Sequence, residues 1–582
     1  MSYLQTFESW LKSPALREAE RAELQSLEGD AVAIEERFGR SLEFGTAGLR
    51  GVVGLGLSRM NIFTVRQATA AFGRVILEDN PGTPELCLCF DCRLSSLDLA
   101  RETAAVLAGQ GIRVRMFLEP RPTPQLSFAI RSLGTAAGIN ITASHNPKNY
   151  NGYKAYWRTG AQLDGDLADR VAAHMAAIDP LDCAPKTTFA NACKAGQITF
   201  LGAELDAAFK AACLGCVIDK SAIQSSMDMK IVYTPFHGVG GSIFPDVLRE
   251  AGFRDVFCVP EQIDPDGTFP TLESPNPEEP EGFALAIEHA AARGADLIIG
   301  TDPDADRVAA VAKDEHGVWT PLSGNQMGGL LFHYILEARK RTGTLPEKAA
   351  LVQTIVSGGL SKAVAAKAGI EVCETFTGFR FMAEAVEALT AQGKQYLLAW
   401  EEAIGYMTGE HVRDKDGIAI GLLIAEMAAH YHARGKGLWA VLAQLWRDFG
   451  AFAERTVNVP LPGAEGAAEM RKIMGCMRTL PPKSISGTAV VRALDYRKGE
   501  ALHLLSQERM ALPMKGMNVL TYQLADDAVF IVRPSGTEPK IKVYIHVKAG
   551  SPEAAAALAD RYAAEAPETL RLWGHQIEYT GE

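Results

Sequence analysis

The segment of residues 142–154 places a nucleophile and several possible cations in one polar stretch, TASHNPKNYNGYK. Ser144 is the nucleophile, and His145, Lys148 and Lys154 are the cations. A serine hydroxyl can hold a phosphoryl group as a covalent intermediate when a base or an electrophile assists it. Asn-Pro and Asn-Gly also form strong turns, so a plain turn is the competing interpretation. The spacing by itself does not separate the two.

Three aspartates, Asp302, Asp304 and Asp306, alternate directly after an apolar stretch. Three oxygen ligands this close together suit a hard cation such as Mg²⁺, with phosphate completing the shell. A calcium-binding EF-hand loop is disfavoured, because Arg307 stands where that loop needs Gly and Lys313 where it needs Glu. A solvated acidic turn competes with the metal site, although unpaired carboxylates so close together repel one another. The loop therefore predicts a divalent metal site.

Further polar segments could bind a sugar or a phosphate. Glu401 and Glu402 could accept hydrogen bonds from vicinal sugar hydroxyls or form a charged turn, and three basic residues follow them, His411, Arg413 and Lys415. Residues 533–540, RPSGTEPK, combine a guanidinium, two hydroxyls and a glycine, which are parts of a phosphate cradle or of a strand-connecting turn. Residues 45–51, GTAGLRG, are also glycine-rich. The absence of Walker, zinc-protease and dinucleotide-binding motifs leaves metal-assisted phosphate chemistry on serine.

Alternating strands and helices are predicted to position these loops. The predicted strands are 85–90, 112–117 and 136–141 in a first unit, 230–234, 256–259 and 296–299 in a second, and 350–355, 371–375 and 395–399 in a third. In such sheets ligands bind beyond the carboxyl ends of the strands, where the polar loops begin. After about residue 440, short consecutive strands and a final helix predict an α+β domain. The expected fold is three similar α/β domains with mixed, largely parallel sheets plus a C-terminal α+β domain, arranged around a central cleft. The expected limits of the four domains are residues 1–210, 211–322, 323–440 and 441–582.

Length and composition agree with a multidomain globular protein. The 582 residues, 47% of them hydrophobic, suit about four domains, and a net charge of −12 argues against broad binding to nucleic acid or anionic membranes. Residues 1–23 are predicted to form one amphipathic helix instead of a signal peptide, so a cytoplasmic location is expected. Ten cysteines are too sparse for a disulfide scaffold. A zinc site at Cys87, Cys89 and Cys92 or at Cys213 and Cys216 is the less favoured hypothesis, because the first two alternate along a strand and no matching Cys/His pair follows Cys216.

Together, the motifs TASHNPKNYNGYKAY, GTDPDADR, the Glu401-Glu402 loop and RPSGTEPK occur in the order found in the α-D-phosphohexomutase superfamily. The chain most resembles its phosphoglucomutase branch, which also includes phosphopentomutases and glucose-1,6-bisphosphate synthases. The resemblance implies interconversion of glucose 1-phosphate and glucose 6-phosphate through a phosphoserine at Ser144, with glucose 1,6-bisphosphate as activator and intermediate. It further implies one Mg²⁺ held by Asp302, Asp304, Asp306 and a phosphoserine oxygen at Ser144.

The resemblance also suggests roles for other residues. The candidate proton acceptors are His145, Lys154 and Lys415. Arg533, Ser535, Gly536 and Thr537 would hold the non-transferring phosphate, Glu401 would orient sugar hydroxyls, and the expected cleft-lining residues are Arg50, Arg307, Thr377, Gly378 and Arg380. Ala403 stands where many relatives have Ser, which leaves glucose, mannose and pentose phosphates open as substrates.

Two different functions compete with the mutase. One is a haloacid-dehalogenase-type enzyme with Asp304 as nucleophile. It is disfavoured because that nucleophile normally follows the first strand of its domain, whereas the acidic loop here follows the third predicted strand of its unit. The second is a non-catalytic sugar-phosphate sensor, which the intact Ser144 and the three aspartates disfavour. Small-molecule sugar phosphates are the expected partners of a monomer or homodimer.

Overall fold

The computed structural model describes residues 2–46, 48–461, 466–535 and 540–575. The chain divides into two compact units. The first comprises Met1–Gly324, Tyr334–Ala349 and Gly378–Leu438, and the second comprises Asn325–His333, Ala350–Thr377 and Trp439–Glu582. Within the described ranges, no helix combines the length and the apolar character needed to cross a membrane.

The N-terminal region forms separate short helices, so the prediction of one helix over residues 1–23 is wrong. The helices are α1 (Tyr3–Lys12), α2 (Glu18–Gln25) and α3 (Ala31–Phe38). Pro14 explains the break after α1, because proline lacks a backbone N–H and its ring clashes with the preceding turn. Ser2 caps α1 by accepting a hydrogen bond from the backbone N–H of Gln5.

The first α/β module is built on a six-stranded mixed sheet. Its strand order is β1 (Leu49–Val52), β5 (Tyr150–Trp157), β4 (Ala137–Ile141), β2 (Glu85–Phe90), β3 (Arg113–Phe117) and β6 (Ile198–Leu201). Strand β2 pairs in parallel with β3 and β4, whereas β5 runs antiparallel to β4. The helices of this region are α4 (Ile62–Asp79), α5 (Ser96–Gly109), α6 (Thr123–Leu133), α7 (Gly165–Ala176), α8 (Phe189–Lys194), α9 (Ala203–Leu214) and α10 (Lys220–Gln224).

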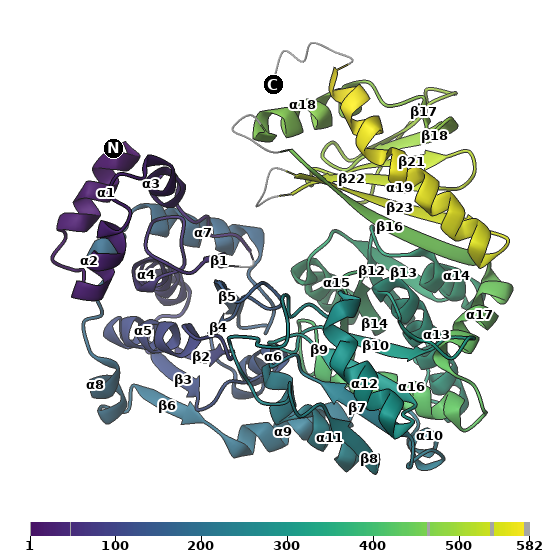
Figure 1. The fold of residues 1–582 in the computed structure, drawn as a ribbon, viewed down its shortest axis with the longest axis horizontal. Coiled ribbons are helices and arrows are strands. Elements are labelled where there is room, and N and C mark those ends of the chain that lie inside the picture. Colours follow the sequence, from purple (N-terminus) through teal and green to yellow (C-terminus); the bar gives the residue numbers. More distant parts are fainter. Residues whose placement is uncertain (1, 47, 462–465, 536–539, 576–582) are drawn as a thin grey trace. The chain divides into compact units, whose positions relative to one another are not determined.

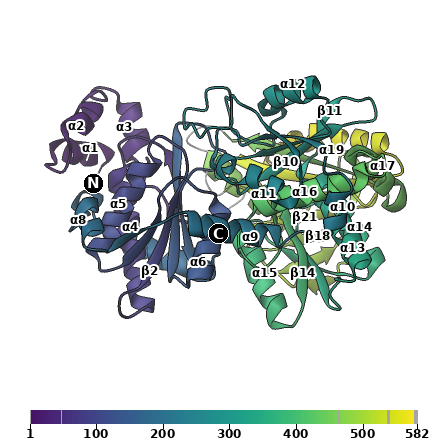
Figure 2. The same cartoon turned by 90° about the horizontal axis from the view of Figure 1, so that it is seen from below.

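The two faces of β2 pack against different helices, which lie on either side of the sheet in Figure 2. Leu86 and Leu88 belong to the hydrophobic core formed with α4 and α5. Cys87 and Cys89 alternate with them and join the core formed with α6. This burial accounts for both cysteines as core residues of a strand that is covered on both faces.

The second module repeats the arrangement. Its five-stranded sheet has the order β11 (Trp319–Pro321), β10 (Val308–Lys313), β9 (Leu297–Thr301), β7 (Lys230–Thr234) and β8 (Asp255–Cys258). Strand β7 pairs in parallel with β8 and β9, and β10 returns antiparallel to β9. The helices are η2 (Val239–Ser242), α11 (Phe244–Ala251), η3 (Pro280–Phe283) and α12 (Ala284–Arg293).

The elements of the third module are divided between the two units. The second unit holds the parallel pair β12 (Ala349–Thr354) and β13 (Glu371–Thr375) with α14 (Gly359–Ala368). The first unit holds α15 (Phe379–Ala391), the antiparallel hairpin of β14 (Gln395–Glu401) and β15 (Gly405–Met407), and the buried helix α16 (Gly417–His432). Helix α13 spans Gly324–Thr342.

The three polar loops predicted in the α/β modules share one backbone feature. Strands β4, β9 and β14 are each followed by an antiparallel strand. Each connecting loop contains one non-glycine residue in the left-handed region, Ser144 at φ 51°, Ala305 at φ 52° and Ile404 at φ 50°. Such strained conformations persist only where the surroundings enforce them, and they cluster at functional sites.

The C-terminal domain is α+β, as predicted (Figure 1). Its eight-stranded sheet has the order β16 (Ala451–Pro460), β23 (Lys540–Ala549), β22 (Val529–Pro534), β21 (Leu520–Leu524), β18 (Thr488–Asp495), β19 (Glu500–His503) and β20 (Arg509–Ala511), with β17 (Ser484–Ile485) pairing β18. Helices α18 (Gly466–Thr479) and α19 (Pro552–His575) contribute to the core under this sheet, and α17 (Leu438–Phe449) precedes it.

Candidate active site

The hydroxyl of Ser144 lies between an acid and a cation from the β9–β10 loop. Its Oγ donates a hydrogen bond to Asp302 Oδ2 at 2.5 Å and accepts one from Arg307 Nη1 at 2.7 Å. Ser144 is fully buried, and its own N–H donates to Thr142 Oγ1 at 2.9 Å. A phosphoryl group on this oxygen would therefore lie beside a guanidinium and the acidic loop.

The three predicted metal ligands, Asp302, Asp304 and Asp306, come together. All three are buried, and one carboxylate oxygen from each lies within 4.8 Å of the others. Asp304 Oδ1 has no hydrogen-bond partner within the described part of the chain. Burial and the charges of Asp304 and Asp306 raise the pKa of Asp302 well above its usual range. A divalent cation would satisfy the orphaned oxygen and offset the repulsion, so these residues fit Mg²⁺.

Two buried lysines border the aspartates. Lys154 Nζ donates to Asp304 Oδ2 at 2.6 Å and to Asp306 Oδ2 at 2.8 Å. Lys415 Nζ lies 3.0 Å from Asp414 Oδ1 and 3.3 Å from Asp306 Oδ2. Burial alone would lower the pKa of each lysine, but the neighbouring carboxylates outweigh it and both pKa values are raised. Both side chains are therefore ammonium ions at neutral pH.

His145 is half-buried next to the serine. Its Nδ1 lies 3.3 Å from Ser144 Oγ and 3.0 Å from Arg307 Nη1. Burial and the positive charges of Arg307 and Arg50 lower the pKa of His145 well below its usual range. The imidazole is thus neutral at neutral pH, and Nδ1 accepts the Arg307 hydrogen bond.

Arg93 holds the backbone of the serine loop, although no sequence motif indicated it. Its Nη2 donates to the carbonyls of Ser144 at 2.6 Å and Asn146 at 2.5 Å, and its Nη1 donates to those of Pro147 at 2.8 Å and Tyr150 at 2.9 Å. The guanidinium is buried, lies over the Phe269 ring, and pairs with Asp91, whose Oδ2 is 3.3 Å from Nε. An Arg just after β2 gives no sequence signal for contacts with carbonyls more than fifty residues away.

Thr123 and Asp414 are further site residues that the motifs did not indicate. Thr123 Oγ1 donates to Asp304 Oδ2 at 2.6 Å and accepts from Asn140 Nδ2 at 2.7 Å. Asp414 Oδ2 accepts hydrogen bonds from Tyr156 Oη at 2.8 Å and Gln162 Nε2 at 2.9 Å. The position of Asp414 directly before Lys415 was an available signal, whereas Thr123 opens a helix and looks like an ordinary helix start.

Arg307 connects the acidic loop to the predicted sugar loop. Its Nε donates to the carbonyl oxygen of Ala403 at 3.2 Å, and Arg307 forms an isolated bridge with Gly405. Glu401 is half-buried at the end of β14, and burial raises its pKa. The Glu401 loop therefore lies next to the serine and metal loops.

The structure brings eight of the predicted site residues into one contact network: Ser144, His145, Lys154, Asp302, Asp304, Asp306, Arg307 and Lys415. The prediction that Lys154 lies in a loop is wrong, because this residue belongs to β5.

The remaining predicted site residues have different surroundings. Arg50 is an exposed residue of β1 that donates to Asn146 Oδ1 at 3.0 Å. Arg380 lies in the first turn of α15 over the Phe381 ring, after Gly378 at φ 113°. Thr377, Arg533 and Ser535 belong to the second unit, where the Ser535 N–H donates to the Lys540 carbonyl at 2.8 Å. Gly536 and Thr537 lie outside the described residues.

Comparison with known proteins finds four consecutive family models. They describe phosphoglucomutase/phosphomannomutase α/β/α domain I at residues 41–182, domain II at 210–317, domain III at 323–449 and the C-terminal domain at 509–565. Proteins named phosphoglucomutase from Staphylococcus haemolyticus and Staphylococcus aureus are each 35% identical over 88% of this chain and 91% of their own length.

Solved structures share the fold. Parafusin, described as a phosphoglucomutase, from Paramecium is 17% identical with a TM-score of 0.66 over 93% of this chain and 98% of its own. A phosphoglucomutase/phosphomannomutase family protein from Burkholderia thailandensis is 20% identical with a TM-score of 0.63 over 90% and 97%. An N-acetylphosphoglucosamine mutase from Aspergillus fumigatus, solved with GlcNAc-6P and magnesium, is 15% identical with a TM-score of 0.50 over 96% and 99%.

Proposed function

The chain belongs to the phosphoglucomutase/phosphomannomutase family, and we propose that it interconverts glucose 1-phosphate and glucose 6-phosphate through a phosphoserine at Ser144. The observation that supports this most strongly is the buried Ser144 hydroxyl between Asp302 and Arg307. An unassisted serine is a poor nucleophile, and a carboxylate and a guanidinium at hydrogen-bonding distance provide the assistance.

The reaction is two phosphoryl transfers at one serine. A free hydroxyl of the sugar monophosphate attacks the phosphoserine phosphorus, the bond to Ser144 Oγ breaks, and a sugar bisphosphate forms. The bisphosphate reorients, Ser144 Oγ attacks the phosphorus of its other phosphoryl group, the bond from that phosphorus to the sugar oxygen breaks, and the isomeric sugar monophosphate leaves. Arg307 Nη1, already at the serine oxygen, stabilises the charge on the transferring group. Asp302, Asp304 and Asp306 with the phosphoserine would hold Mg²⁺, which when bound neutralises phosphoryl charge.

We propose His145 as the proton acceptor for the return transfer, in which Ser144 Oγ is the attacking hydroxyl. A base must lie within hydrogen-bond reach of that hydroxyl, and His145 Nδ1 lies 3.3 Å from Ser144 Oγ. Lys154 and Lys415, the two competing candidates, have ammonium groups bonded to carboxylates. We assign them to charge balance around the acidic loop.

Substrate recognition is proposed from sequence position and local surroundings. Glu401 would orient sugar hydroxyls, and the proposed cleft-lining residues are Arg50, Thr377, Gly378 and Arg380. Arg533, Ser535, Gly536 and Thr537 would hold the non-transferring phosphate. This is supported by their composition, by Arg533 lying at the end of β22 and by Ser535 following that strand. The domain limits 1–210, 211–322, 323–440 and 441–582 remain part of this proposal.

Phosphomannomutase activity is the second candidate. The matching family includes phosphomannomutases, and Ala403 offers Arg307 only its carbonyl and has no hydroxyl for the sugar. Turnover of pentose phosphates is the remaining possibility for the same chemistry. We also propose a cytoplasmic location, supported by cysteines that are all free thiols.

The test is turnover of glucose 1-phosphate with Mg²⁺ and a trace of glucose 1,6-bisphosphate. We expect glucose 6-phosphate, and we expect Ser144→Ala to lose both turnover and the phosphoryl adduct seen by intact-protein mass spectrometry. Mannose, ribose and deoxyribose 1-phosphates in parallel assays rank the sugars. Failure to turn over any of the four, or an active Ser144→Ala variant, would exclude the proposed mechanism.

A further inference from the structure

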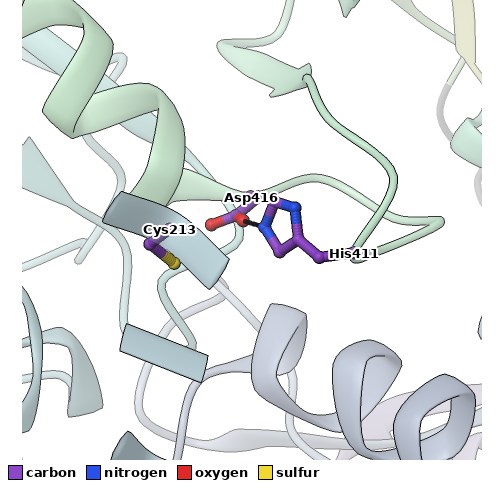
Figure 3. Close-up of side chains that lie close together, drawn as sticks. All are labelled: Cys213, His411 and Asp416. Atoms are coloured by element: carbon purple, nitrogen blue, oxygen red, sulfur yellow. Dashed lines mark hydrogen bonds and ion pairs between the residues drawn. The ribbon is translucent and has the colours of Figure 1, made fainter. Parts of the chain in front are cut away.

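Away from the aspartate site, a second group of metal-binding side chains lies in the first unit. Cys213, His411 and Asp416 place a sulfur, a ring nitrogen and a carboxylate oxygen within 4.8 Å of one another (Figure 3). Cys213 is in the last turn of α9, and the other two lie in the segment between β15 and α16, where Asp416 is the N-cap of α16. Cys213 and Asp416 are fully buried, and the His411 side chain is 8% exposed.

Asp416 fixes the orientation of the imidazole. Its Oδ1 caps α16 by accepting the N–H groups of Ile418 at 2.9 Å and Ala419 at 3.0 Å. Its Oδ2 lies 2.7 Å from His411 Nε2. Oδ1 is thus hydrogen-bonded to the N-terminus of α16. Oδ2 lies beside the imidazole nitrogen, and the Cys213 sulfur is close by.

Cys216 contacts the opposite side of the same ring. Its Sγ lies 3.8 Å from His411 Nδ1. Gly409, at φ 71°, allows this approach, because a Cβ there would meet both Cys216 Sγ and His411 Nδ1 at 3.1 Å. Phe209 of α9 packs against the imidazole with ring centroids 6.2 Å apart. The ring is therefore held on each of its edges by a defined partner.

We propose that Cys213, His411 Nε2 and Asp416 Oδ2 form a second metal site, which binds one Zn²⁺ ion with water as the fourth ligand. Ligands at roughly 2.0–2.3 Å around a tetrahedral zinc lie about 3.3–3.8 Å apart, which small movements of the three side chains would reach. Binding displaces the Cys213 thiol proton and leaves the imidazole proton on Nδ1, where Cys216 Sγ accepts its hydrogen bond. Cys216 is then a positioning residue and not a ligand.

The donor set decides the metal class. A thiolate and an imidazole favour zinc over magnesium, which prefers oxygen ligands, so this site and the aspartates select different ions. The sulfur ligand of the proposed site is the Cys213 thiolate, and Cys213 is buried in the last turn of α9. The competing interpretation is a hydrogen-bonded cluster that binds nothing.

The site would connect a helix of the first module to the segment that ends in the active site. Asp416 follows Asp414 and Lys415, whose side chains belong to the network around Asp306. An ion held between α9 and Asp416 would anchor this segment. We therefore expect zinc to stabilise the folded chain and to leave the phosphoserine chemistry itself unchanged.

The test is cobalt titration of metal-free protein, with excess Mg²⁺ to occupy the aspartates. The wild type should bind one Co²⁺ with a thiolate-to-cobalt charge-transfer band in the near ultraviolet, and one equivalent of Zn²⁺ should remove the band and raise the melting temperature. Cys213→Ser should lose the band. Cys216→Ser should keep it with about tenfold weaker affinity, as expected for a partner of a ligand.

Two further variants guard against misfolding and indirect effects. Asp416→Asn keeps the helix cap while removing the charge, so it should fold and lose affinity about as strongly as Cys213→Ser. Cys193→Ser, a half-buried cysteine of α8, should bind cobalt like the wild type. Circular dichroism and mutase activity report folding separately from metal binding. No band in the wild type, a band that survives Cys213→Ser, or a band lost equally in Cys216→Ser would overturn the assignment.

Discussion

Arg93 is expected to affect the rate of the reaction through the serine loop, which its guanidinium contacts. Its guanidinium donates to four carbonyls of the loop that holds Ser144 in a left-handed conformation at φ 51°. A left-handed non-glycine residue costs about 1–2 kcal/mol, which the surroundings must supply. Arg93→Lys is the sharpest perturbation, because an ammonium keeps the charge but has three donors and no planar fork.

The magnitude follows from the lost hydrogen bonds. A lysine leaves at least one buried carbonyl unpaired, at about 1–3 kcal/mol each, which matches the strain at Ser144. If the loop relaxes and moves Ser144 Oγ by on the order of 1 Å, kcat should fall about 100-fold. KM should change little, since the contacts described for Arg93 are with the loop, Asp91 and the Phe269 ring, and none of these is proposed to bind the sugar. The phosphoryl adduct at Ser144 should form more slowly at an unchanged final level.

The assay is steady-state turnover of glucose 1-phosphate with intact-mass measurement of the adduct. Arg101→Lys, an exposed arginine of α5, is the matched control and should behave like the wild type. Asp91→Asn, which weakens the ion pair to Arg93, should give a smaller loss of kcat. If Arg93→Lys lowers the melting temperature but leaves kcat and KM unchanged, the arginine only stabilises the fold and the positioning role is refuted.

Three other outcomes test the site and the fold. Chelation should abolish turnover, and Mg²⁺ should restore it in the wild type but not in Asp304→Asn; activity that survives chelation would contradict the metal assignment. Thr123→Val removes the hydroxyl that donates to Asp304 and should weaken Mg²⁺ binding about 10–100-fold with kcat unchanged at saturating Mg²⁺, measured by titration of activity. In the second unit, burial raises the pKa of Glu454 from 4.5 to about 7, so its protonated form stabilises the fold below pH 4.5 and this stability is lost as pH rises through 7. The free energy of unfolding should therefore drop by up to about 3 kcal/mol between roughly pH 5 and pH 8 in the wild type and less in Glu454→Gln, and identical pH profiles would argue against the shift.

The three site loops were predictable because each combines turn-forming residues with an apolar strand before it. Strands such as Glu85–Phe90 and Lys230–Thr234 lie where the apolar runs predicted them. The strands that return antiparallel were harder to predict. Strand β5 contains Asn151 and Lys154 at buried positions, and buried polar residues look like a loop unless their partners are known. The partners of Lys154 are Asp304 and Asp306, which belong to another module.

Contacts between distant segments account for the residues that no motif indicated. Arg93 donates to backbone carbonyls. Every residue has a backbone carbonyl, so the residue types in the sequence do not indicate these partners. Cys213 and Cys216 have no second Cys/His pair close by in sequence, which disfavoured a zinc site there. The structure instead brings His411 to Cys216 across 195 residues, and adds Asp416 on the far side of its ring. Ligand spacing rules apply to small zinc modules and fail when a large fold assembles the donors.

The contacts of Arg307 predict that the choice of sugar can change without a change in the phosphoryl chemistry. Its Nη1 reaches Ser144 Oγ at 2.7 Å, its N–H donates to Asp302 Oδ1 at 3.0 Å, and its Nε reaches the Ala403 carbonyl at 3.2 Å. The contact with the sugar loop uses backbone and not side chain, so it is independent of the residue at position 403. Replacing a serine by Ala403 removes a hydroxyl that a sugar could use but leaves the connection among the three loops intact. We therefore expect a substitution at position 403 to change the sugar preference while Ser144 keeps its contacts with Arg307 and Asp302.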